Sequence, residues 1–151
     1  MAGERADFQI INDGIKNNLI FYKPVNIMGT ITSSHDQVRF ISFADGQIGF
    51  EENAIERAFH DPPINVLNKS SYDKLFMFNV MNMCLPGIPV IYYGEEIGML
   101  GAGDPDNRRP MRFQNELAAE EKEFLNKMRK LIKLRSKHPT LSLVIGIQFI
   151  N

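Results

Sequence analysis

The sequence has little cysteine, no long apolar run and no excess of charge of one sign. Its one cysteine, Cys84, excludes an internal disulfide and, having apolar neighbours, is expected to pack as a small hydrophobic side chain. No apolar run reaches the roughly 18 residues that a membrane span requires. Seventeen basic and eighteen acidic residues are interspersed, so neither nucleic acid nor an anionic membrane is an expected partner. The sequence therefore favours a soluble protein with an uncharged partner, and it leaves the compartment undefined.

The first half of the chain alternates regular and irregular segments. The 151 residues suffice for one ordinary domain or a part of one. Apolar residues spaced by three and four over 6–22 predict an amphipathic helix that Pro24 ends, and a period of two over 25–32 predicts a short strand. Residues 42–69 lack a regular period, apart from a short helix expected around 52–59. So long an irregular segment more often covers a site than joins two elements.

The second half of the chain predicts a helix, a strand and another helix. Ser70 or Ser71 is a suitable N-cap for a buried helix, and IPVIYY, residues 88–93, is continuously apolar and predicts an interior strand. From Asn115 to Pro139, acidic residues early and basic residues late predict a helix. Its expected core stripe comprises Leu117, Phe124, Leu125, Met128, Leu131 and Ile132. Alternating strands and helices build parallel sheets, so the expected fold class is α/β.

Polar loops follow both predicted strands. HDQVR, residues 35–39, follows the first strand, and GEEIGMLGAGDPDNRR, residues 94–109, follows the second. Parallel strands end at the same edge of a sheet, and ligands of α/β folds bind outside that edge. We therefore expect the two loops to lie together at a binding site.

Each loop also has simpler interpretations. An adjacent His35 and Asp36 more often cap a turn than bind a substrate. A calcium loop beginning at Asp104 is excluded, because Arg108 and Arg109 would stand where an EF-hand needs a ligand and a glycine. Phosphate binding by the glycine-rich turn lacks the Walker pattern and would be opposed by the nearby aspartates. The acidic and basic residues of this loop could also pair with each other and make it rigid.

Taken together and in this order, the two loops resemble the α-amylase family, glycoside hydrolase family 13. HDQVR is similar to the motif after the family's seventh barrel strand. GIPVIYYGEEIGM followed by GDPDNRRPM is similar to the eighth strand and the loop beyond it, with the neopullulanase, cyclomaltodextrinase and maltogenic α-amylase branches nearest. The resemblance extends from about Ala6 to Pro139, and LSLVIGIQFIN resembles the entry to the family's carboxy-terminal β-sandwich.

The resemblance implies a partial TIM (β/α)8 barrel. Residues 1–140 would hold the last two strand–helix units of a glycosidase barrel, and residues 141–151 would begin a truncated β domain. A whole barrel takes about 250 residues. We therefore expect a fragment of a larger enzyme.

The resemblance also implies roles for individual residues. Asp36 would be catalytic, as the carboxylate that stabilises the transition state, and His35 would bind hydroxyl groups of the same sugar. Asp104 and Arg108, at the D-x-x-x-R spacing, match a pair that binds glucose hydroxyls, and Arg39 of HDQVR joins this substrate-binding set. Carboxylate and guanidinium groups suit neutral sugars because they form strong charge-assisted hydrogen bonds. The residues expected to shape the pocket are Tyr92, Tyr93 and Glu96.

Two essential groups are missing from this set. Retaining glycoside hydrolysis needs a nucleophile and an acid about 5–5.5 Å apart, and in the family these follow the fourth and fifth strands. GERAD, residues 3–7, fits the nucleophile frame G-x-R-x-D, but only twenty-eight residues separate Asp7 from Asp36. That interval cannot hold two further strand–helix units, so we interpret the match as chance. Ser34, where most members have asparagine, is a further departure from the family pattern.

The expected protein is thus a fragment of a retaining α-glucan hydrolase that is inactive alone. The alternatives are a glucosyltransferase of the same family and a non-catalytic carbohydrate-binding or assembly module. An α-glucan or maltooligosaccharide is the expected substrate, and open sheet edges suggest self-association. No cofactor or metal is predicted from these residues, although a full-length parent could bind calcium through segments absent here. The choice between α-1,4 and α-1,6 linkages cannot be derived from the sequence.

Overall fold

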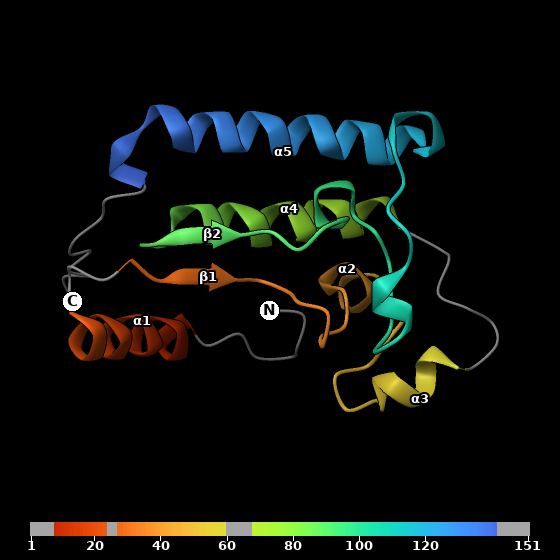
Figure 1. Cartoon of the computed structure of the whole chain (residues 1–151), viewed down its shortest axis with the longest axis horizontal. Coiled ribbons are helices and arrows are strands. Elements are labelled where there is room, and N and C mark those ends of the chain that lie inside the picture. Colours follow the sequence, from red (N-terminus) through yellow and green to blue (C-terminus); the bar gives the residue numbers. More distant parts are fainter. Residues whose placement is uncertain (1–7, 24–26, 60–67, 142–151) are drawn as a thin grey trace.

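Two short parallel strands lie between helices in the protein (Figure 1). The structure is a computed structural model and describes residues 8–23, 27–59 and 68–141. The helices and strands are α1 (Phe8–Tyr22), β1 (Gly29–Ile31), α2 (Phe40–Ala44), α3 (Ala54–Ala58), α4 (Lys69–Cys84), β2 (Ile88–Val90) and α5 (Ala119–Lys137). The short 3-10 turns are η1 (Glu95–Ile97), η2 (Asp106–Arg108), η3 (Gln114–Glu116) and η4 (Pro139–Leu141).

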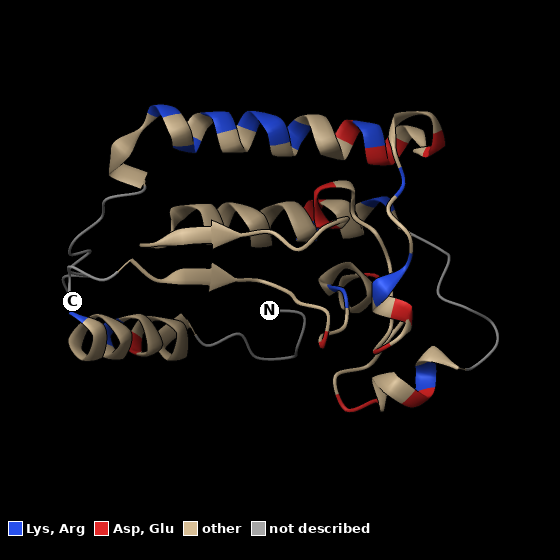
Figure 2. Cartoon of the chain, viewed as in Figure 1, with Lys and Arg blue, Asp and Glu red and all other residues tan. Residues whose placement is uncertain are grey.

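The strands β1 and β2 pair in parallel, with Gly29 opposite Ile88 and Ile31 opposite Val90. This pairing confirms that the two predicted strands are parallel neighbours. Both are shorter than expected, and β2 does not have the buried position predicted for it, because Ile88 is 57% exposed. No third strand covers them among the described residues. The strands carry no charge, whereas the loops at their carboxyl ends carry both signs (Figure 2).

The hydrophobic core lies among α2, α4, α5 and the loop after β2. Phe124 and Met128 are one turn apart on α5, so both face α4, where Tyr72 and Leu75 are also one turn apart. The ring centroids of Tyr72 and Phe124 are 5.5 Å apart. The buried members of the cluster are Ile41, Ile48, Tyr72, Leu75, Leu100, Ala102, Phe124 and Met128. This core fixes the base of the loop that follows β2.

The helices form near the predicted positions but bury less surface than expected. Helix α1 has no buried residue. In α5, Phe124 and Met128 are buried as predicted, whereas Ile132 is 43% exposed. Helix α4 begins at Lys69, so its N-cap is Asn68 and the serines predicted for this role lie inside the helix. Cys84, predicted to pack as a small hydrophobic residue, is exposed at the end of α4.

Two of the sequence predictions concern residues outside the ranges that the structure describes. The β-domain start predicted for 141–151 lies, apart from Leu141, outside the described residues, as does the GERAD segment. Among the helices that the structure describes, none is both long and apolar enough to cross a membrane.

Candidate functional site

Four side chains meet where the loops after β1 and β2 come together. The Arg108 guanidinium lies 3.6 Å from the Asp36 carboxylate and 3.1 Å from the Asp104 carboxylate. His35 Nε2 is 3.1 Å from the Asp36 carboxylate. We call His35, Asp36, Asp104 and Arg108 the rim cluster. The two sequence motifs are therefore brought into one site, as their order after two parallel strands predicted.

The rim cluster is open to solvent. The Asp36 side chain is 70% exposed, and the Arg108 side chain is 44% exposed. Exposed ion pairs contribute about 0–1 kcal/mol to stability, so these contacts orient the side chains more than they stabilise the fold. The cluster presents guanidinium donors and carboxylate acceptors, which can form charge-assisted hydrogen bonds to the hydroxyl groups of a sugar.

Asn107 lies directly beneath the rim cluster and is fully buried. Its side-chain nitrogen donates hydrogen bonds to the main-chain oxygens of His35, at 2.6 Å, and Gln37, at 3.0 Å. Arg108 Nε also donates to the oxygen of His35, at 3.3 Å. The turn η2 therefore holds the loop after β1 through both backbone and side-chain groups. The sequence pattern assigns this asparagine no role, since nothing in the motif distinguishes it from a surface residue.

Arg39 lies below the site and does not face it. The residue is 0% exposed, its Nε donates to Asn107 O at 3.0 Å, and its Nη1 donates to Tyr93 O. Its guanidinium carbon is 4.2 Å from the ring centroid of Tyr92 and 4.8 Å from that of Tyr93. Burial lowers the pKa of Arg39, while the adjacent tyrosines and acids oppose this effect. The placement differs from the predicted sugar-binding role, because these carbonyl and aromatic contacts keep the guanidinium from solvent.

The residues predicted to shape the pocket lie around Arg39. The rings of Tyr92 and Tyr93 are edge to face, 4.6 Å apart, and Tyr93 Oη donates to Arg109 O at 3.0 Å. Burial raises the pKa of Tyr92. Glu96 is half-buried in η1. These residues support the loop after β2, and their role in a pocket stays a prediction.

Glu95, which our sequence analysis did not select, is a buried acid beside the carboxyl end of β1. Thr32 Oγ1 donates to its carboxylate at 3.0 Å. Burial raises the pKa of Glu95, and the Thr32 hydrogen bond and the charge of Arg39 only partly offset this effect. The Glu95 carboxylate thus connects the loop after β2 to Thr32 at the start of the loop after β1.

Asp106 and Arg109 form an internal link within the loop after β2. Asp106 accepts two hydrogen bonds from Arg109, at 2.7 and 2.9 Å, and one from the backbone nitrogen of Ala102, at 2.8 Å. Burial tends to raise the pKa of Asp106, but the Arg109 and Ala102 contacts outweigh it and lower the pKa. The pairing of acids with arginines within this loop, one of the interpretations of the sequence, is thus confirmed.

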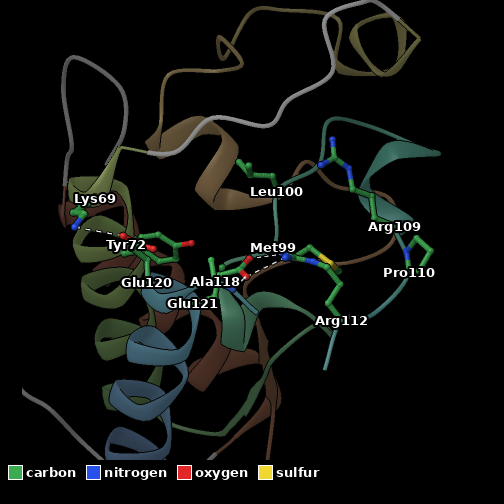
Figure 3. Close-up of a pocket in the computed structure, with 11 residues that line it drawn as sticks. Lys69, Tyr72, Met99, Leu100, Arg109, Pro110, Arg112, Ala118, Glu120 and Glu121 are labelled. Carbon is green, nitrogen blue, oxygen red and sulfur yellow. Dashed lines mark hydrogen bonds and ion pairs between the residues drawn. The ribbon is translucent and has the colours of Figure 1, made fainter. Parts of the chain in front are cut away.

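A pocket with a volume of about 820 Å³ lies elsewhere, between the start of α4, residues 98–100 and 109–112 of the loop after β2, and the start of α5. Figure 3 shows that its charged side chains pair across it, Arg112 with Glu121 and Lys69 with Glu120. Tyr72 also lines this pocket, and burial raises its pKa to about 12. None of the rim cluster residues lines it. The rim cluster, unlike this pocket, joins the loops that follow both parallel strands, so we place the candidate site there.

No group of three or more His, Cys, Asp or Glu side chains in the described parts of the chain is arranged to hold a metal ion.

The fold and the site define an α/β chain whose polar groups gather at the carboxyl edge of parallel strands. The family model of the α-amylase catalytic domain matches residues 6–137. The chain therefore belongs to the α-amylase family, as the resemblance of its two motifs implied.

Individual relatives match this chain over a small part of their length. A cyclomaltodextrinase of Thermoanaerobacter pseudethanolicus is 31% identical over 76% of this chain and 16% of its own length. A maltogenic α-amylase of Bacillus acidopullulyticus is 38% identical over 55% of this chain and 14% of its own. The crystal structure of an α-amylase of Geobacillus thermoleovorans in complex with acarbose matches with a TM-score of 0.64 and 30% identity. That match covers 93% of this chain and 26% of the other.

Proposed function

We propose that the chain is the carboxy-terminal part of the (β/α)8 barrel of a retaining α-glucan hydrolase. Residues 1–140 would supply the last two strand–helix units, and residues 141–151 would begin the following β domain. The matched family model, the short spans covered in longer relatives and the parallel pairing of β1 and β2 support this proposal. The nucleophile and the general acid would come from segments outside this chain.

Asp36 is the catalytic residue of this proposal. Cleavage of a glycosidic bond passes through a transition state with positive charge on the sugar ring. A carboxylate held beside that ring lowers the energy of the transition state more than that of the bound sugar. His35 would bind hydroxyl groups of the same sugar as Asp36, and Asp104 and Arg108 would bind glucose hydroxyls on the non-reducing side of the cleaved bond. The contact of Arg108 with both Asp36 and Asp104 is the observation that carries the proposal.

An α-glucan or maltooligosaccharide is the proposed substrate. The relatives named above include a cyclomaltodextrinase and a maltogenic α-amylase, and the related crystal structure contains acarbose. We further propose that the isolated 151-residue chain does not hydrolyse α-glucans. Release of maltose from starch or a cyclodextrin by the purified chain would contradict this part.

A hybrid enzyme tests the role of Asp36. Residues 6–137, the span of the family match, replace the corresponding segment of the Thermoanaerobacter pseudethanolicus cyclomaltodextrinase, which matches this chain over 115 residues and supplies the remaining strands. Asp36→Ala is expected to lower kcat on a cyclodextrin by roughly 100- to 1,000-fold, with a much smaller change in sugar affinity. The matched control is Asp73→Ala on α4, since the Asp73 side chain is 75% exposed and contacts only Lys127, at 3.6 Å, among described ion pairs.

Two measurements decide the result. Steady-state kinetics give kcat, and product inhibition by maltose gives the affinity for an uncharged, undistorted sugar ligand. Equal losses in both would reduce Asp36 to a binding residue, and an unchanged kcat would remove its catalytic role. Analysis of the products separates hydrolysis from transfer to a sugar acceptor.

A further inference from the structure

We propose that Asn107 is the positioning residue that holds Asp36 in its working place. This inference rests on the proposed role of Asp36 and adds a residue to which neither our sequence analysis nor the family match assigned a role. Asn107 does not reach the rim cluster's open face, so it acts through the backbone on either side of Asp36.

The geometry of the contact is specific to residue 36. The two carbonyl oxygens that Asn107 binds belong to His35 and Gln37, the residues directly before and after Asp36. The Asn107 side-chain nitrogen thereby bonds the carbonyl oxygens on both sides of Asp36, and both of its hydrogens are used. Asn107 is 0% exposed and the two bonds are partly buried, which reduces competition from water. The Asp36 backbone nitrogen itself donates to Ser34 Oγ at 3.2 Å, a contact within the loop after β1.

An asparagine side chain is required for this contact. It places two donors on one atom at the end of a short side chain, whereas serine has one donor and an ionised aspartate has none. Asn107 Oδ1 is buried and has no hydrogen-bond partner in the part of the chain that the structure describes. An unsatisfied buried acceptor costs stability, so the residue's contribution lies in its two donors.

Asn107 is itself held by the loop that it positions. Arg39 Nε donates to Asn107 O at 3.0 Å, and Arg39 N donates to Gly101 O at 3.3 Å. Gly101 packs so closely that a Cβ there would lie 2.8 Å from the Asn107 Cα. The neighbouring Arg108 reaches the Asp36 carboxylate from the same turn. The turn η2 therefore positions both the backbone around Asp36 and the Arg108 guanidinium beside the Asp36 carboxylate.

The first test uses kinetics in the hybrid enzyme defined above. A misplacement of about 1 Å can cost about 100-fold in rate, so Asn107→Ala is expected to lower kcat about 10- to 100-fold with little change in KM. Asn107→Ser, which keeps one donor, should lose less, and Asn107→Asp, which keeps the shape without the donors, should lose at least as much. Asn79→Ala is the matched control, because Asn79 is 1% exposed and its side-chain nitrogen donates to Leu75 O at 3.0 Å within α4.

The second test examines the loop after β1 without measuring a catalysed reaction. Hydrogen exchange of the 151-residue chain, followed by mass spectrometry, should become faster in the peptide covering residues 33–39 when Asn107 is replaced by alanine. Peptides from α4 and α5 should keep their rates. Asn79→Ala should give the opposite pattern, with faster exchange in α4 and an unchanged 33–39 peptide.

The outcomes separate this inference from the proposed function. If Asp36→Ala abolishes turnover and Asn107→Ala leaves kcat and the exchange of 33–39 unchanged, the positioning role is overturned while the proposed function stands. If Asp36→Ala leaves turnover intact, the proposed function fails whatever Asn107 does. Equal losses of kcat in Asn107→Ala and Asn79→Ala would show a general effect of lost stability and would also overturn the positioning role.

Discussion

At the scale of single residues, the site depends on contacts of two kinds. The rim cluster residues stand at its surface in a chain order that a motif can reveal, so the sequence predicted that they would meet. Asn107 and Arg39 work from below, through main-chain oxygens of residues distant in sequence. No local pattern predicts which carbonyl a buried side chain will meet, because that depends on how the two loops pack. For this reason the HDQVR motif, which includes Arg39, could not predict that this side chain would be buried.

Asp106 gives the loop after β2 a dependence on pH. Its pKa in the folded chain is lowered from 3.8. A carboxyl group with a lowered folded pKa stabilises the fold above its unfolded pKa, and the contribution is lost as pH falls through the folded value. Asp106→Asn should therefore reduce stability at pH 7, and the difference from the parent should shrink as pH falls from about 5 to below 3.8.

Urea unfolding at a series of pH values, followed by circular dichroism, measures this difference. Asp13→Asn on α1 is a suitable control, since Asp13 lies outside the loop and has an exposed hydrogen bond with Gln9. A loss of stability that is the same at pH 7 and pH 3 would show that the Asp106 pair acts through shape rather than charge.

At the scale of elements, periodicity and proline located the long helices and both strands. Helix α2 was missed because five residues, FISFA, are too few to show a helical period. The start of α4 was misplaced because Asn68, Ser70 and Ser71 all have N-cap chemistry, so the residue type does not select among them. The exposure of the strands could not be predicted, because it depends on which elements lie beside them.

Phe124 tests the packing of α5 against α4. It is 1% exposed and contacts the ring of Tyr72, so Phe124→Ala is expected to lower the free energy of unfolding by about 3–5 kcal/mol. Phe113, which is 69% exposed, provides the same substitution outside the core and should change stability by less than about 0.5 kcal/mol. Urea unfolding compares the two variants, and similar losses would place Phe124 outside the cooperative core.

At the scale of the whole molecule, apolar surface gathers on the strands and α1. Ile27 is 73% exposed, Ile31 64%, Ile88 57% and Phe21 78%. In a complete barrel, further strands and helices would cover such faces. Without them, each described strand keeps one unpaired edge, and an apolar edge strand is a template for pairing with another chain.

We therefore expect the isolated chain to self-associate through β1 and β2. Sedimentation velocity should show species heavier than 17.2 kDa that increase with concentration. Lysine on edge strands opposes pairing between chains, so Ile31→Lys combined with Val90→Lys should shift the chain toward the monomer. Phe59→Lys replaces an apolar side chain at the end of α3 that is 73% exposed, more than Ile31 or Val90, and should have little effect. A single 17.2 kDa species at every concentration, or equal effects of the strand and α3 substitutions, would show that the strand edges do not drive association.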